Sequence, residues 1–168
     1  MRTRLVGFLF ITGMAVVGTA VAGLNANWST HASGSLEVPP RATSAQSQAI
    51  FHLSDDASEL QYKLIASNIE NVVASHIHVG ASGANGPIVA FLYGTVAPGA
   101  GRTDGILAKG TITAANLIGP LAGKSLADLI ALLDSGGAYV NVHTNDGVDP
   151  INTGPGDFPG GEVRGDIK

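Results

Sequence analysis

The 168-residue chain contains no cysteine, and only 5% of its residues are aromatic and 13% charged. Without cysteine, the chain cannot form disulfide bonds, thiolate metal sites or a cysteine nucleophile. Its lysines and arginines are scattered and the formal net charge is −4, so it lacks the basic surface of a nucleic-acid-binding protein. A G-x-S-x-G elbow, a P-loop and a dinucleotide-binding fingerprint are also absent. The sequence therefore makes no positive case for hydrolase or nucleotide chemistry.

Residues 1–22 have the pattern of a secretory signal peptide. Arg2 and Arg4 precede an uncharged stretch, and an A-V-A step that ends at Ala22 is a suitable cleavage site. We therefore expect a secreted or extracytoplasmic protein. The apolar stretch at residues 5–24 approaches the roughly 18 residues that a membrane span needs, so an uncleaved membrane anchor is the alternative.

The rest of the chain is interpreted as a linker at residues 23–32, rich in Asn, Ser, Thr and Ala, and one β domain at residues 33–168. A first strand is predicted around Leu36 and Val38, ended by two prolines. Alternating apolar and polar residues between turns predict most of the others, and the continuous apolar run PIVAFLYG predicts a more fully buried strand. These lie in the segments AQSQAIFHLS, ELQYKLIASNI, VVASHIHVG, PIVAFLYG, GILAKGTIT, AYVNVHT and GGEVRGDIK. About eight short strands favour a single antiparallel β-sandwich or Greek-key barrel.

One short helix is predicted near residues 126–134, inserted between the strands. Ser125 is a suitable N-cap and Asp128 follows three residues later, near the positive end of the helix. The apolar residues recur at helical spacing and form one stripe, which consists of Leu126, Leu129, Ile130 and Leu133.

Three motifs occur in an order that is typical of a known family. They are the segments ASHIHVGASGANGPIVAFLY, SLADLIALLDSGGAYVNVHT and PGGEVRGDI. On these motifs the chain resembles the CHRD (chordin-type) domain family, including its stand-alone exported microbial members, over nearly all of residues 33–168. The resemblance implies an extracytoplasmic β domain without a settled biochemical activity. The cysteine-rich modules of chordin are missing, so growth-factor antagonism is not implied.

Three histidines are the candidate metal ligands. Side chains two residues apart in a strand point to the same face, so His76 and His78 project together, and His143 shares a face with Tyr139 and Asn141. If the two strands are neighbours, three imidazoles meet on one surface. Imidazole is the commonest side-chain metal ligand and suits copper and zinc. One shared ion would require ring nitrogens within roughly 4 Å of each other.

Two interpretations of these histidines stay open. In the first they are structural, hydrogen-bonding to Asn141, Thr144 or backbone carbonyls, and the protein is a non-enzymatic binding or structural module that acts on a protein or cell-surface polymer. In the second the protein binds copper or zinc, with redox chemistry of the superoxide-dismutase type as one form. An H-x-H strand is similar to the copper site of copper/zinc superoxide dismutases, although that family's disulfide and bridging-histidine zinc loop have no counterpart here.

Two polar segments near the end of the chain receive simpler interpretations. The stretch TNDGVDPINTGPGDFPGGE is rich in oxygen ligands, but its spacing is not that of an EF-hand, so we interpret it as turns. Glu162, Arg164 and Asp166 alternate in the last strand and predict an exposed row of ion pairs. Arg164 is the candidate for an anion anchor near the histidines.

Overall fold

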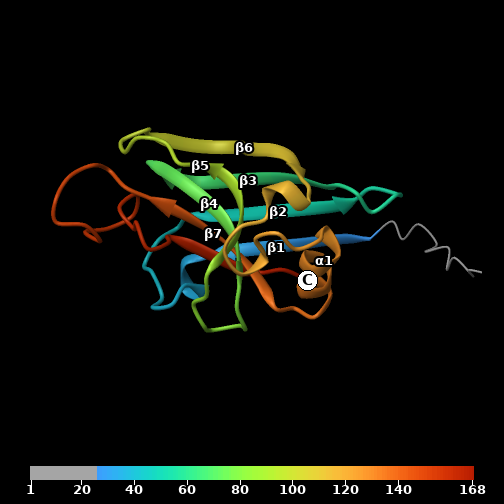
Figure 1. The fold of residues 1–168 in the computed structure, drawn as a ribbon. Coiled ribbons are helices and arrows are strands. Elements are labelled where there is room, and N and C mark those ends of the chain that lie inside the picture. The colour runs from blue at the N-terminus through green and yellow to red at the C-terminus, as the bar shows by residue number, and fades with distance from the viewer. Residues whose placement is uncertain (1–25) are drawn as a thin grey trace, which may run out of the picture.

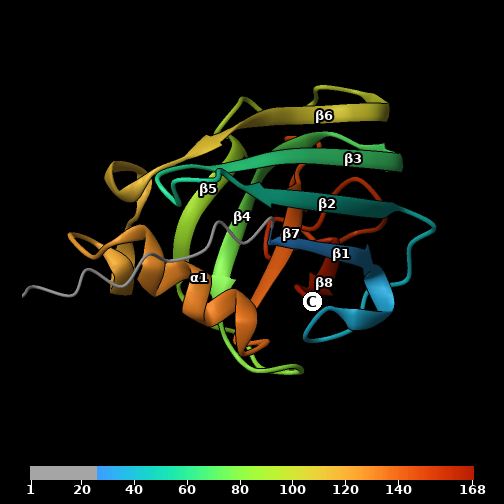
Figure 2. The same ribbon diagram turned by 90° about the vertical axis from the view of Figure 1, so that its right-hand side faces the viewer.

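The computed structural model describes residues 26–168, so the expected signal peptide lies outside the described residues. Eight antiparallel strands form one nearly closed sheet, a β-barrel (Figures 1 and 2). The elements are β1 (Asn27–Ser33), β2 (Gln46–Leu53), β3 (Leu60–Glu70), β4 (Val72–Val79), β5 (Ile88–Gly94), β6 (Arg102–Ile112), α1 (Leu126–Asp134), β7 (Ala138–Thr144) and β8 (Val163–Asp166). Their order in the sheet is β5-β4-β7-β8-β1-β2-β3-β6, which confirms the predicted mostly β fold.

Helix α1 lies at one end of the barrel, and the long loop at residues 145–162 lies at the other end (Figure 1). The predicted cap is present, because the Ser125 amide donates to Asp128 Oδ2 at 2.9 Å. Leu129 and Leu133 are buried in the main hydrophobic core. Trp28 Nε1 of β1 donates to Asp134 Oδ1 at 3.1 Å and ties the helix to the sheet. No helix in residues 26–168 is long and apolar enough to cross a membrane.

The chain enters the barrel earlier than predicted. Residues 27–32, assigned above to a linker, belong to β1, which pairs along its whole length with β2. Its inward residues are Trp28, Thr30 and Ala32, so only one large apolar side chain marks the buried face. The strand predicted around Leu36 is wrong. Residues 34–36 form a 3-10 helix, and Leu36 is exposed.

The two edge strands of the sheet, β5 and β6, face each other across the seam of the barrel. Tyr62 of β3 spans this seam, and its hydroxyl donates to the Leu92 carbonyl of β5 at 2.7 Å. The segment predicted as a fully buried strand, PIVAFLYG, is therefore an edge strand, with Phe91 turned outward and 42% exposed.

The strands differ in how their outer faces are covered. In β2 buried and exposed residues alternate without exception, as expected of a sheet with one face in water. In β4, β7 and β8 every residue is at least partly buried. The loops at residues 37–45, 80–87 and 145–162 account for the difference, because they make hydrogen bonds to outward side chains of these strands and to one another. The outer face of β4, β7 and β8 is thus buried beneath these loops, and the side chains buried there are mainly polar.

Candidate metal centre

The register between β4 and β7 brings the three histidines together on this polar face. His76 lies opposite Asn141, His78 lies opposite Tyr139, and His143 follows two residues after Asn141. The residues between them, such as Ile77 and Val142, are fully buried in the barrel. The two strands are neighbours, so the side-chain alternation places all three imidazoles on one surface, as the sequence predicted.

The distances between the imidazoles come close to those of a shared ion. His76 Nδ1 lies 3.1 Å from His143 Nε2, near the separation of two ligands on one tetrahedral ion with bonds of about 2 Å. One nitrogen from each of the three rings lies within 4.8 Å of the other two. This largest separation of 4.8 Å between ligand nitrogens exceeds the roughly 4 Å that the sequence analysis required for one shared ion. The ring centroid of His78 is 6.2 Å from that of His143, so His78 is the ring that an ion would have to draw inward.

Backbone carbonyls set the tautomers of two of the rings. His78 Nδ1 donates to the Gly86 carbonyl at 2.8 Å, and His143 Nδ1 donates to the Pro159 carbonyl at 2.8 Å. In the neutral rings Nε2 therefore carries the lone pair. Metal-binding histidines commonly donate their second ring nitrogen to a carbonyl or carboxylate in this way. With His143 Nε2 acting as an acceptor, His76 Nδ1 is the donor of the hydrogen bond between those two rings.

The site favours neutral imidazoles. Burial, together with the neighbouring His143 and His78, lowers the pKa of His76 to about 3. Burial also lowers the pKa of His78, more strongly than its hydrogen bond to Gly86 and the nearby Asn141 side chain raise it. Burial lowers the pKa of His143 too, and it outweighs the hydrogen bond to the Pro159 carbonyl, which raises it. A metal ion competes with protons for these lone pairs, so imidazoles that stay neutral are ready to act as ligands.

A buried nitrogen and a buried oxygen in the site lack hydrogen-bond partners. Asn141 lies opposite His76 and two residues before His143, and although its side chain approaches His78, His78 Nε2 and Asn141 Oδ1 do not meet at hydrogen-bonding geometry. A buried polar atom without a partner is costly, and its presence calls for an explanation. An ion bound by His78 Nε2 would supply the missing partner of that nitrogen. On the outer side the ring of Phe91 packs edge-on against His76, at 4.5 Å between centroids.

The row formed by Glu162, Arg164 and Asp166 is buried at its first two residues and partly buried at Asp166, so the prediction that it is exposed is wrong. Glu162 is fully buried and Arg164 is 1% exposed, because the loops cover this strand. Glu162 accepts hydrogen bonds from Thr43, Thr144 and the Gly156 amide.

Arg164 cannot serve as the anion anchor that the sequence suggested. Its guanidinium donates to Ala81, Ala84 and Asn85 of the neighbouring loop and lies 3.7 Å from Asp166. Alternation placed these residues on the outer face correctly, but it could not show that loops would cover that face.

The oxygen-rich segment at residues 145–162 folds as turns. The Val148 amide donates to Asp146 Oδ1, and the Thr153 amide donates to Asp157 Oδ2. Within residues 26–168 the three histidines are the one group of three or more His, Cys, Asp or Glu side chains placed to hold an ion. Sequence reasoning expected backbone carbonyls as partners if the histidines are structural, but it could not identify Gly86 and Pro159, because a backbone acceptor carries no side-chain signal.

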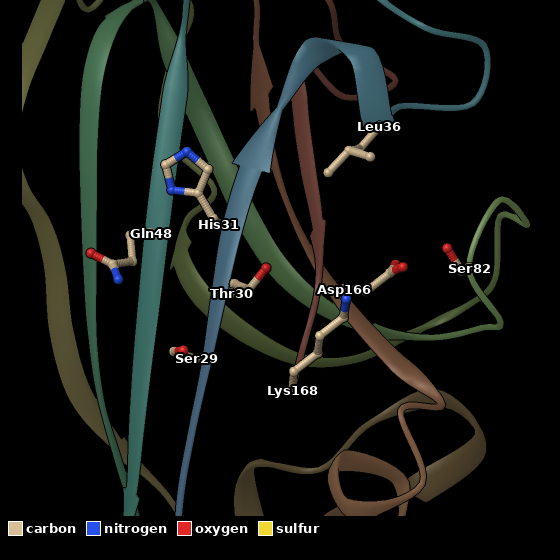
Figure 3. A pocket seen from close by; sticks show the side chains of 8 residues that line it. All are labelled: Ser29, Thr30, His31, Leu36, Gln48, Ser82, Asp166 and Lys168. Carbon is tan, nitrogen blue, oxygen red and sulfur yellow. The ribbon is translucent and has the colours of Figure 1, made fainter.

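A surface groove with a volume of about 410 Å³ lies apart from the histidines, over β1 and the end of the chain (Figure 3). Leu36 stands at the top of the view and Ser82 at the right, and the side chains of Asp166 and Lys168 lie below Leu36 with their ends close together in this view (Figure 3). Its lining is mainly polar and carries one acidic and one basic side chain. The lining residues are Ser29, Thr30, His31, Leu36, Gln48, Ser82, Asp166 and Lys168.

The family model of the CHRD domain matches residues 28–167. The match begins within β1 and reaches nearly to the end of the chain, so it includes the strand that sequence reasoning had assigned to a linker. No curated protein and no solved structure matches this chain.

Proposed function

The chain belongs to the CHRD domain family, and from this premise we propose that it is an exported module that binds one copper or zinc ion through His76, His78 and His143. The observation that carries the proposal is the pair of backbone carbonyls that hold the Nδ1 protons of His78 and His143. This arrangement puts the lone pairs of His78 and His143 on Nε2. The lone pair of His143 accepts the proton of His76 Nδ1, which a bound ion would displace, whereas His78 Nε2 is buried without a partner, unlike a ring nitrogen of a purely structural histidine.

The chemistry of the three ligands favours a borderline transition metal. Three neutral imidazoles suit copper and zinc, and harder ions such as calcium prefer oxygen ligands. A set of three histidines leaves a fourth position for water or an external ligand. The part of the site near Phe91 is the more open one, since that side chain is 42% exposed.

Export is part of this proposal and is supported by the N-terminal pattern of Arg2, Arg4 and the following uncharged stretch. Outside the cytoplasm a protein without cysteine has no thiol that copper could oxidise or capture. The site would then act on metal ions in the extracytoplasmic space.

Metal analysis of the untagged protein tests the proposal. We expect about one equivalent of copper or zinc in the purified protein, or after loading and dialysis, as measured by inductively coupled plasma mass spectrometry. His76→Ala and His143→Ala should each lose the metal while keeping the β-sheet circular dichroism spectrum.

His52→Ala is the matched control for these variants. His52 lies on the outer face of β2, where its ring contacts Asn27, and should not affect loading. A folded wild-type protein that holds neither ion after loading would overturn the proposal. If His143→Ala unfolds a protein that binds no metal, the histidines are structural.

A second candidate function is the binding of a hydroxyl-rich surface polymer in the groove of Figure 3. The groove offers hydrogen-bonding side chains of both charge signs beside the apolar Leu36, a combination that suits the mixed polar and apolar faces of a sugar ring. Titration with chitotetraose should shift the amide NMR signals of Ser29, Ser82 and Asp166. Unchanged spectra with chitotetraose and cellotetraose at millimolar concentration would exclude this function.

A further inference from the structure

Tyr139 lies between a candidate metal ligand and a buried cation. Its ring stacks on His78, with centroids 4.8 Å apart and an interplanar angle of 12°. The guanidinium carbon of Arg164 lies 3.5 Å from the centroid of the same ring. Since β4 and β8 flank β7 on opposite sides, the imidazole and the guanidinium approach Tyr139 from opposite directions. The position of His78 is therefore tied to that of Arg164.

Arg164 also binds the loop that orients His78. Its Nη1 donates to the Ala84 carbonyl at 3.0 Å and to Asn85 Oδ1 at 3.3 Å, and its Nη2 donates to the Ala81 carbonyl at 3.1 Å. Arg164 is 1% exposed, so these contacts replace its hydration shell. Burying a cation costs several kcal/mol of folding free energy unless acceptors of this kind surround it. The planar guanidinium of arginine can donate to several such acceptors at once.

The loop ends at Gly86, which contacts both stacked rings. Its carbonyl accepts the Nδ1 proton of His78 at 2.8 Å, and its amide donates to the Tyr139 hydroxyl at 3.0 Å. A Cβ atom at this position would overlap the Val79 carbonyl oxygen, so only glycine fits. The Gly86 carbonyl is thus held at one point in space by the loop, by Tyr139 and by the neighbouring backbone.

We infer that Tyr139 and Arg164 are positioning residues of the histidine site: they hold the 81–86 loop so that the Gly86 carbonyl fixes the tautomer and ring orientation of His78. This inference rests on the proposed metal function. The two residues do not touch the ion. They keep the Nε2 lone pair of His78 unprotonated and directed into the site before an ion arrives, and so reduce the free energy that binding would spend on ordering the ring.

The test compares three variants with one matched control. Tyr139→Phe removes the hydroxyl and keeps the stacked ring, Tyr139→Leu removes both, and Arg164→Lys keeps the charge but loses the fork. The control is Tyr62→Phe, which also removes a hydroxyl bonded to the backbone, at 2.7 Å from the Leu92 carbonyl, but lies away from the histidines.

Metal affinity and spectra are the first readout. Zinc affinity, measured by competition with a chromophoric chelator, should fall roughly 10–100-fold in Tyr139→Leu and Arg164→Lys and by a smaller factor in Tyr139→Phe. The electron paramagnetic resonance spectrum of the copper-loaded variants should change as well. Tyr62→Phe should lower the melting temperature and leave affinity and spectrum as in the wild type. Wild-type affinity and spectra in all three folded variants would overturn the inference.

The tautomer of His78 is a second readout that needs no metal. Long-range ¹H–¹⁵N NMR spectra of the metal-free protein should show a proton on His78 Nδ1, and Tyr139→Leu should give a mixture of tautomers. If the wild type binds no metal but the tautomer changes in the variant, the proposed function fails and the positioning role stands. An unchanged tautomer in both Tyr139→Leu and Arg164→Lys would refute the positioning role.

Discussion

The two halves of this barrel follow the same alternation of side chains but place them in different surroundings. On β2 and β3 the outward residues, such as Gln48 and Lys63, face water. On β4, β7 and β8 the outward residues are polar too, yet His76, Asn141 and Arg164 are all buried. Three loops make the difference, by covering one outer face and leaving the other open. A polar outward residue therefore indicates a solvent-exposed face only where no loop covers it.

The covered half must pair every polar group that it buries. A buried polar group without a partner costs roughly 1–3 kcal/mol, and a buried charge costs more. The hydrogen bonds of Glu162 and Arg164 largely meet this requirement. Within the described residues the cost is left unmet at His78 Nε2 and Asn141 Oδ1 in the candidate site, and also at Glu37 Oε1, Arg41 Nε and Asp157 Oδ1 in the covering loops.

The largest loss of stability should come from replacing Glu162, in the half of the barrel that the loops cover. This carboxylate accepts hydrogen bonds from Thr43 at 2.6 Å, Thr144 at 2.7 Å and the Gly156 amide at 2.8 Å. Glu162→Ala leaves three donors unpaired, two of them buried and Thr43 partly buried, and should lower the free energy of unfolding by roughly 4 kcal/mol. Urea denaturation measures this loss. The matched change Glu59→Ala, at an exposed turn, should stay within about 0.5 kcal/mol, and equal losses at both sites would contradict the comparison.

The next largest effect should come from the apolar interior that both halves share. Leu64 of β3 is fully buried, and Leu64→Ala should lower the free energy of unfolding by roughly 3 kcal/mol through lost burial and a cavity. Its neighbour Lys63 points outward, so Lys63→Ala serves as the control in the same denaturation experiment. A loss below about 1 kcal/mol at Leu64 would mean that this end of the core is loosely packed.

A smaller effect, on the order of 2 kcal/mol, should appear as a pH dependence of the free energy of unfolding. Its source is a carboxyl group in the half of the barrel that the loops cover. Burial raises the pKa of Glu37 to about 7, although Arg164 and Arg41 lower it. The folded state then holds a proton that the unfolded state releases between about pH 4.5 and 7, so stability falls as pH rises through that window. Glutamine does not titrate, so Glu37→Gln should lack this loss of stability between about pH 4.5 and 7. At pH 7.5 the variant should therefore have a larger free energy of unfolding than the wild type.

His76 has the opposite sign in an overlapping window. Burial lowers the pKa of His76 in the folded protein to about 3 from its ordinary value of 6.5, so its contribution to stability grows as pH rises from about 3 to 6.5. The contribution of His76 is the same in the wild type and in Glu37→Gln. The difference between their free energies of unfolding at each pH therefore isolates the contribution of Glu37. Parallel stability–pH curves for the two proteins would refute the assignment.

The smallest effect should come from the open half. Ile106 on edge strand β6 is 63% exposed, and Ile106→Thr should change the free energy of unfolding by less than about 0.5 kcal/mol. Chemical denaturation at low protein concentration measures this change. A loss above about 1 kcal/mol would show that a further segment or a second copy covers β6.

Much of the fold and the candidate site could be predicted from local patterns. Alternation located His76, His78 and His143 on common faces, and helical spacing with Ser125 located α1. The first strand was missed because its inward face holds Thr30 and Ala32 beside Trp28, too little apolar surface to mark a strand. The burial of Arg164 was missed because its acceptors lie about 80 residues away, in the 81–86 loop.

The sequence by itself determined which side chains share a face of each strand, because the two-residue period of a strand is a local property of the backbone. It also determined the absence of thiol chemistry. Only the tertiary structure decided that β4 lies beside β7, that loops bury the outer face of β4, β7 and β8, and that the carbonyls of Gly86 and Pro159 meet the imidazoles. Those features depend on contacts between segments far apart in the chain, and no local pattern encodes which segments meet.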